Sequence, residues 1–204
     1  MEFFRRAGGA PGSLGILPGT FNPPTRAHMG LAQAGLAVVD EVVFVLPRVL
    51  PHKTYAGVGF EDRLRMLEAA VGDRARCSIA ASPEGLFIDI ARECRKAYGP
   101  GVALKFLCGR DAAERIVNWD YGRPGALSEM LREFGMLVAA RQGTFEIAPG
   151  FEDAIRFLPM PPDYDEISAT RVREAMAEGR AWEHWVPEEV APLARRLYAQ
   201  PLSS

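Results

Sequence analysis

The chain has 204 residues, of which 48% are hydrophobic and 25% charged, and its formal net charge is −2. These values are typical of one globular domain with a substantial core, and the lack of a basic block gives no support to binding of a nucleic-acid polymer. No apolar run approaches the roughly 18 residues of a membrane span, and no apolar segment of a signal peptide follows Arg5 and Arg6. The three widely spaced cysteines predict reduced, buried thiols in a cytoplasmic protein and not a disulfide framework or a zinc site.

Residues 1–13 are rich in Gly, Pro and Ala, and we expect a flexible lead-in there, followed by one domain over residues 14–204. Short apolar runs that alternate with stretches of helical periodicity fill this domain. The predicted strands are residues 14–17, 41–46, 76–80, 102–108, 136–140 and 155–158, and the predicted helices are residues 26–39, 60–71, 86–98, 111–119, 126–134, 169–178 and 187–200.

This alternation predicts an α/β fold: a Rossmann-like, doubly wound parallel sheet covered by helices on both faces, in a single domain with C-terminal helices. In such sheets a ligand binds beyond the carboxyl ends of the strands. The polar motifs described next all fall at such ends.

The first motif is the stretch L-G-I-L-P-G-T-F-N-P-P-T-R-A-H at residues 14–28, which predicts a strand, a rigid turn and the start of a helix. Free backbone N–H groups and the helix dipole favour phosphate at such a helix start. Gly19 allows a ligand to approach the backbone closely, and Thr25 and His28 share one face of the first helical turn. A lone Thr-x-x-His is, however, more often an N-cap with a buried histidine.

The second motif, I-S-A-T-R-V-R at residues 167–173, opens the predicted helix 169–178. Ser168 is a natural N-cap, and the hydroxyl of Thr170 and the guanidinium of Arg173 follow on the first turn. Taken alone, such a motif is more often a capped helix with solvated arginines than a binding site.

Three weaker signals follow other predicted strands. Lys53, in a Pro-His-Lys loop, is a mobile charge suited to phosphate, or a solvated loop residue. Asp111, after Cys108-Gly109-Arg110, can accept both hydroxyls of a ribose or cap a helix. Trp119 is a flat ring that elsewhere is more often core, and Arg141 ends a predicted strand.

The two motifs resemble the signatures of the nucleotidyltransferase superfamily with the HxGH and ISSTxxR motifs, most closely its nicotinate and nicotinamide mononucleotide adenylyltransferases. Thr25 and Ala27 stand where the usual first signature has His and Gly, and Ala169 replaces the second Ser of the other. The resemblance implies transfer of the adenylyl group of ATP, with Mg²⁺, to a phosphate-bearing acceptor that is a pyridine mononucleotide, in NAD biosynthesis. It implies no metal ligands from the protein itself.

The resemblance also implies a role for each motif residue. The catalytic residues are His28, Thr25, Lys53 and Arg173. ATP would be bound by Gly19, Thr20, Phe21, His28, Gly109, Asp111, Ile167, Ser168, Thr170 and Arg173. The mononucleotide would be bound by Thr20, Asn22, Lys53, Trp119 and Arg141.

Two alternatives remain open. One is another adenylyl- or cytidylyltransferase of the superfamily, acting on phosphopantetheine or a polyol phosphate. The other is a nucleotide-binding regulator without turnover. It is favoured by Thr25 and Ala27, which depart from the first signature, and by Leu86-Phe87, which lie in the stretch where nicotinate-type enzymes carry a Tyr-Thr pair. A dinucleotide-binding oxidoreductase is disfavoured because no G-x-G-x-x-G follows the first predicted strand. The choice between nicotinate and nicotinamide, and a possible homo-oligomer, stay open.

Overall fold

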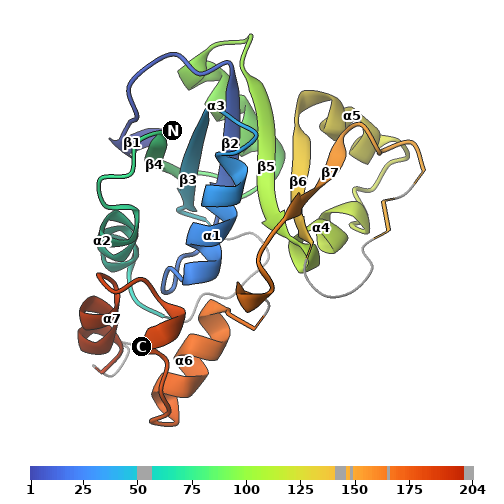
Figure 1. Ribbon diagram of the computed structural model, residues 1–204. Helices are drawn as coiled ribbons and strands as arrows, with labels where there is room; N and C mark the ends of the chain where they lie inside the picture. Colours follow the sequence, from blue (N-terminus) through green and yellow to red (C-terminus); the bar gives the residue numbers. More distant parts are fainter. Residues whose placement is uncertain (50–56, 141–145, 148, 165, 200–204) are drawn as a thin grey trace.

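The computed structural model describes residues 1–49, 57–140, 146–147, 149–164 and 166–199 (Figure 1). Its centre is a seven-stranded sheet in the order β1-β4-β3-β2-β5-β6-β7. Every neighbouring pair is parallel except β1 and β4, which are antiparallel. The strands are β1 (Glu2–Arg5), β2 (Ser13–Pro18), β3 (Glu41–Pro47), β4 (Cys77–Ser82), β5 (Ala103–Gly109), β6 (Gly135–Ala140) and β7 (Ile155–Pro159).

Helices join these strands and complete the α/β fold that the alternating pattern predicts. Within the described residues they are α1 (Arg26–Gly35), α2 (Phe60–Val71), α3 (Phe87–Tyr98), α4 (Arg110–Val117), α5 (Ala126–Glu133), α6 (Ala169–Ala177), α7 (Ala191–Tyr198) and the short 3₁₀ helices η1 (Pro162–Tyr164) and η2 (Glu183–Trp185). The predicted Rossmann-like architecture is confirmed. No helix in this part of the chain has the length and apolar character to cross a bilayer.

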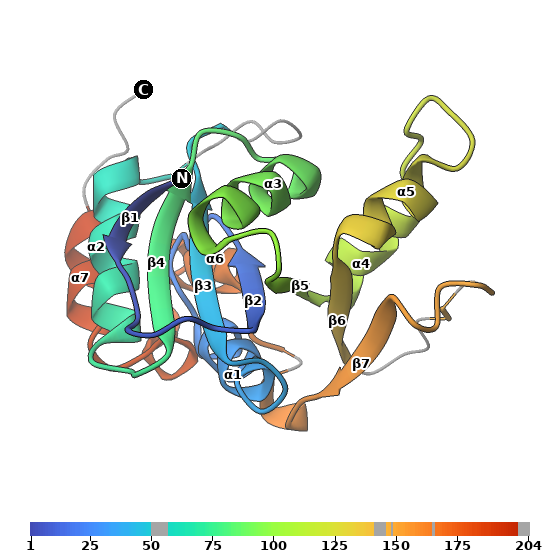
Figure 2. The same ribbon diagram turned by 90° about the horizontal axis from the view of Figure 1, so that it is seen from above.

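The inner strands β3 and β4 are buried on both faces, as their continuous apolar runs require. In β3, Val43 and Val45 point into one core with α3, α4 and α5, whereas Val42, Phe44 and Leu46 point into the other with α1 and α2. Because successive side chains of a strand point to opposite faces, one apolar run contributes side chains to both cores. Seen from above, α4 and α5 lie beside β6, on the opposite side of the molecule from α2 and α7 (Figure 2).

The two C-terminal helices pack on the outer side of α2 and not on the sheet. Val172 of α6 and Ala194 of α7 share a buried cluster with Met66 and Ala70 of α2. This packing brings the start of α6 close to the carboxyl end of β2, although about 150 residues separate them in the chain (Figure 1).

The expected loose lead-in is wrong for its first residues, because Glu2–Arg5 forms β1 on the edge of the sheet. The ring of Phe3 meets Tyr98 edge-on with centroids 5.8 Å apart, and the guanidinium of Arg6 lies 4.7 Å from the Tyr98 ring centroid. The Gly- and Pro-rich residues that follow obscured this short strand in the sequence.

The direction in which successive strands are added to the sheet reverses next to β2, at what is called a topological switch point. The chain runs from β2 to β3 and β4 on one side and then crosses to β5 on the other side of β2. Helices therefore leave the two neighbouring strands β2 and β5 toward opposite faces, and the carboxyl ends of these strands are where such folds bind ligands.

Candidate active site

A cavity of about 360 Å³ lies at this switch point, within the range of roughly 300–1,000 Å³ that small-molecule sites occupy. The ends of β2 and β5 and the starts of α1 and α6 line it. Its polar lining includes both motifs: Thr20, Asn22, Thr25, His28, Ser168, Thr170 and Arg173, with Gly109 and Ile167. The two helix starts thus open onto one cavity, as their resemblance to a single bipartite site implies.

The start of α1 fixes the imidazole of His28. Thr25 is fully buried and is the N-cap of the helix. Its backbone N–H donates to Nδ1 of His28 at 3.0 Å, and its hydroxyl oxygen lies 2.7 Å from the same nitrogen. A backbone N–H can only donate, so Nδ1 accepts and the ring proton is on Nε2. The imidazole is therefore an oriented neutral donor in the wall of the cavity, and it caps the helix as well.

Two of the predicted ATP-binding residues, Gly19 and Phe21, lie in the loop before α1 but do not line the cavity. The N–H of Gly19 donates to the carbonyl of Val45 at 3.0 Å, so it is not available to a phosphate. A Cβ on Gly19 would lie 3.0 Å from the ring of Phe21, which shows that its small size accommodates this ring. Phe21 is buried at a φ of 47° and meets His28 edge-on at 5.2 Å. Both residues support the site from behind and do not line the cavity.

Arg63 supports the same loop, and it is not among the site residues that the sequence motifs predict. Its side chain is 4% exposed, and Nη1 donates to the carbonyl of Thr20 at 3.0 Å. The signal was present in the helical pattern, since Arg63 stands four residues before the buried Leu67 and so on the buried face.

The start of α6 presents hydroxyls whose oxygens already accept hydrogen bonds. Ser168 Oγ accepts the N–H of Arg171 at 3.2 Å, and Thr170 Oγ1 accepts from Nη2 of Arg173 at 3.3 Å. Each hydroxyl can therefore give its own proton to a ligand oxygen. Nη1 of Arg173 donates to the carbonyl of Asn22 at 2.7 Å and so joins the two motifs directly.

The cavity lining contains no carboxylate among the described residues, whereas it holds hydroxyls, an imidazole and a guanidinium. Two helix N-termini add partial positive charge. Such a surface favours a polyanion. No cluster of three or more metal-binding side chains occurs within the described part of the chain, so a divalent ion there would be held mainly by the oxygens of the ligand.

Two other predicted residues, Asp111 and Trp119, do not line the cavity. The side chain of Asp111 is 87% exposed and faces Arg110, with 3.8 Å between its Oδ1 and the Nε of that arginine. Trp119 is 45% exposed and lines a second, open hollow with Tyr121. Lys53 and Arg141 fall outside the described residues.

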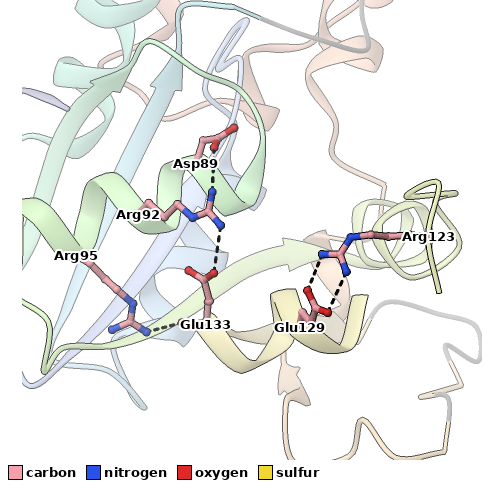
Figure 3. Close-up of polar contacts among 6 residues, drawn as sticks. All are labelled: Asp89, Arg92, Arg95, Arg123, Glu129 and Glu133. Atoms are coloured by element: carbon pink, nitrogen blue, oxygen red, sulfur yellow. Dashed lines mark hydrogen bonds and ion pairs between the residues drawn. The ribbon is translucent and has the colours of Figure 1, made fainter. Parts of the chain in front are cut away.

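The hollow beside Trp119 lies between α4 and α5, and polar contacts join α5 to its surroundings (Figure 3). Arg92 forms an ion pair with Glu133 at 3.4 Å, and Nη2 of Arg95 donates to the carbonyl of Glu133 at 2.5 Å. Arg123 binds Glu129 with two hydrogen bonds, of 2.9 and 2.6 Å, which lower the pKa of that carboxyl. These exposed pairs orient α5, while its apolar face supplies most of the stabilisation.

Two apolar side chains in the cavity wall are not among the site residues that the sequence predicts. The ring of Phe87, at the start of α3, stacks on Phe106 with centroids 4.3 Å apart and lines the cavity. Cys108 also lines it, and burial raises the pKa of its thiol to about 12. The thiol is therefore a neutral wall and not a nucleophile.

Comparison with known proteins agrees with this geometry. A family model described as cytidylyltransferase-like matches residues 16–175. A curated protein of Solibacter usitatus, named "Probable nicotinate-nucleotide adenylyltransferase", is 33% identical over 190 residues, which cover 88% of this chain and 92% of that protein. A protein of the same name from Halalkalibacterium halodurans is 30% identical over 87% of this chain and 86% of its own length.

Solved structures show the same fold. The nicotinic acid mononucleotide adenylyltransferase of Plasmodium falciparum, complexed with NaAD, superposes with a TM-score of 0.68 over 92% of this chain and 97% of that one. The two sequences are 19% identical, so this similarity concerns the fold alone.

Proposed function

This chain belongs to the cytidylyltransferase-like family, and we propose that it joins ATP to nicotinate or nicotinamide mononucleotide, giving the dinucleotide and pyrophosphate, in NAD biosynthesis. The observation that carries the proposal is the single cavity into which both helix starts open. The relatives named as nicotinate-nucleotide adenylyltransferases, which match along nearly the whole chain, support the choice of this reaction.

The reaction requires no nucleophile from the protein. A phosphate oxygen of the mononucleotide attacks the α-phosphorus of ATP, the new P–O bond forms, and the bond from that phosphorus to the bridging oxygen of the β-phosphate breaks. Pyrophosphate leaves with the bonding electrons. Catalysis then consists of positioning the two substrates and stabilising the charge on the transferred and departing phosphates.

On the α1 side, His28 would donate its Nε2 proton to an oxygen of the α-phosphate. Thr25 orients this donor through Nδ1 and replaces the first imidazole of the usual signature. Thr20 and Asn22, which share the cavity wall, would lie against the mononucleotide.

On the α6 side, Ser168, Thr170 and Arg173 would hold the β- and γ-phosphates, assisted by Lys53. Their donated protons, the guanidinium charge and the helix N-terminus all favour the departing pyrophosphate. The carboxylate of Asp111 would accept hydrogen bonds from the ribose hydroxyls of ATP.

The family resemblance assigns two residues, Trp119 and Arg141, to the binding of the mononucleotide and its pyridine ring. Because Trp119 lines a separate hollow, its use requires the mononucleotide to extend from the cavity toward α4.

Magnesium fits the donor set as a companion of ATP. The described lining offers Ser, Thr and Asn oxygens and no carboxylate, a set that leaves the ion bound mainly to phosphate and water. When bound, Mg²⁺ would neutralise phosphate charge, and the side chains described above would orient the phosphates.

The test is pyrophosphate release with ATP, Mg²⁺ and a panel of acceptors: both pyridine mononucleotides, phosphopantetheine and a polyol phosphate. We expect release with a pyridine mononucleotide, and the two rates side by side identify the acid or the amide as the preferred acceptor. Release only with phosphopantetheine or a polyol phosphate would replace this proposal with the other transferase. Tight ATP binding without release for any acceptor would identify a nucleotide-binding regulator.

A further inference from the structure

Asn22, in the middle of the loop between β2 and α1, is held by contacts from three distant parts of the chain. It is 2% exposed, and its carbonyl accepts the hydrogen bond from Arg173. Its side-chain Oδ1 accepts a hydrogen bond from the hydroxyl of Tyr198, the last residue of α7. A Cβ added to Gly57 would lie 2.2 Å from Nδ2 of Asn22, so the backbone before α2 closes on its other side.

This loop depends on such side-chain contacts. Pro23 and Pro24 have no N–H, so neither residue can donate a backbone hydrogen bond that would fix the loop. Donors from other elements reach it instead: Arg63 at the carbonyl of Thr20, and Arg173 and Tyr198 at Asn22. The cavity-lining side chains of Thr20 and Thr25 lie on either side of Asn22, so its position sets theirs.

The helix that carries Tyr198 is itself firmly placed. Val190 and Ala194 are fully buried in the cluster that α7 shares with α2 and α6. The packing of α7 therefore fixes the position from which the Tyr198 hydroxyl donates to Asn22. The same cluster also holds α6, whose start lines the cavity. One apolar unit thus positions both sides of the cavity.

We propose that Tyr198 is a positioning residue of the active site, which acts through Asn22 to hold the loop between β2 and α1 in the geometry that receives the phosphates. This inference rests on the proposed function. Tyr198 does not line the cavity and takes no direct part in the chemistry.

The test is Tyr198→Phe, which removes the hydroxyl and keeps the ring. We expect kcat/KM for pyrophosphate release to fall about fivefold to tenfold, the effect of one hydrogen bond. ATP should bind more weakly by a similar factor, because the loop is less well ordered before binding. Asn22→Ala should lose at least as much, because Asn22 also lines the cavity, and the double variant should lose little more than Asn22→Ala alone.

Tyr98→Phe is a matched control, because it also removes one buried phenolic hydrogen bond to a side-chain oxygen. That bond, to Glu41, lies where the parallel strands begin, at the end of the sheet opposite the cavity. The control should lower thermal stability and leave kcat and KM unchanged, whereas Tyr198→Phe should change the kinetics.

The inference is overturned if Tyr198→Phe keeps wild-type kcat, KM and ATP affinity, whatever its melting temperature. Equal kinetic losses in the two Tyr→Phe variants would also overturn it. Failure of the proposed function is recognised separately, since wild-type protein would then release no pyrophosphate with the pyridine mononucleotides. ATP affinity, measured by calorimetry, still tests Tyr198 in that case.

Discussion

Polar groups are buried at both ends of the parallel strands, but their roles differ. The side of the sheet where these strands begin is called the amino edge below, and the side where they end is called the carboxyl edge. At the amino edge, the carboxylate of Glu41 is 3% exposed and accepts hydrogen bonds from Ser78 at 2.6 Å and Tyr98 at 2.5 Å. Ser78 Oγ in turn accepts the N–H of Ala7. At the carboxyl edge, the buried hydroxyl of Thr25 and the groups at the start of α6 line a cavity.

The difference separates stabilisation from function within one fold. Polar groups at the amino edge bind each other, so each desolvated group is compensated inside the protein. At the carboxyl edge, the hydroxyl oxygens of Ser168 and Thr170 accept hydrogen bonds within the protein, so each hydroxyl can donate its proton to a ligand. We therefore expect changes at the first edge to alter stability and changes at the second edge to alter activity.

The largest expected effect is that of His28→Ala. Removal of an oriented donor to a phosphate costs on the order of 3 kcal/mol of transition-state stabilisation, or 10²–10³ in rate. We expect kcat for pyrophosphate release to fall by that factor, with the circular dichroism spectrum and cooperative unfolding preserved. Turnover near that of the wild type would remove His28 from the mechanism.

Glu41→Ala should have the largest effect at the opposite edge. It leaves the hydroxyls of Ser78 and Tyr98 without their shared acceptor and should lower the free energy of unfolding by about 2–3 kcal/mol. Urea unfolding measures this loss, and Glu41→Gln, which keeps an acceptor oxygen, should lose less. A large loss of turnover in folded Glu41→Ala would contradict the separation of the two edges.

Thr25→Val tests the support of His28 with a smaller change. The side chain keeps its shape and loses the hydroxyl that lies 2.7 Å from Nδ1. We expect about a tenfold lower kcat, the value of one hydrogen bond near 1.4 kcal/mol, and recovery in Thr25→Ser. A wild-type rate in Thr25→Val would mean that the backbone N–H alone orients the ring.

The smallest effect concerns alkaline stability at the amino edge. Burial, and the hydrogen bond to the Glu41 carboxylate, raise the pKa of Tyr98 above its ordinary value. Above pH ~10 the unfolded chain releases this proton and the folded protein retains it, so the stability present below that pH is lost as the pH rises. Tyr98→Phe should lose stability less steeply above pH ~10, as measured by urea unfolding at several pH values. An unchanged slope would contradict this assignment.

Most of the fold followed from local patterns. The apolar runs at residues 14–17 and 41–46 are long enough to fix strand positions, and Gly and Pro mark their ends. The strand Glu2–Arg5 was missed because its pairing with β4 is a contact between distant residues, which a four-residue pattern does not reveal.

The candidate site was predictable where a motif places a side chain directly at a helix start, as for Thr25, His28 and Ser168. It was not predictable where the tertiary structure decides which donors are already used. The N–H of Gly19 is taken by Val45, and Arg63 is drawn into the core to hold the Thr20 carbonyl. The helical pattern places Arg63 on the buried face of its helix, but neither hydrogen bond is encoded in the local sequence.

The central claim is that the starts of α1 and α6 bind the same triphosphate. Calorimetric titration with ATP and Mg²⁺ of the wild type, His28→Ala, Thr170→Val and Tyr98→Phe tests it directly. The account predicts that His28→Ala and Thr170→Val each weaken ATP about tenfold, since each removes a hydrogen bond to a charged group, and that Tyr98→Phe binds like the wild type. An ATP affinity that changes in only one of the first two variants would contradict the claim, because only one helix start would then contact the triphosphate.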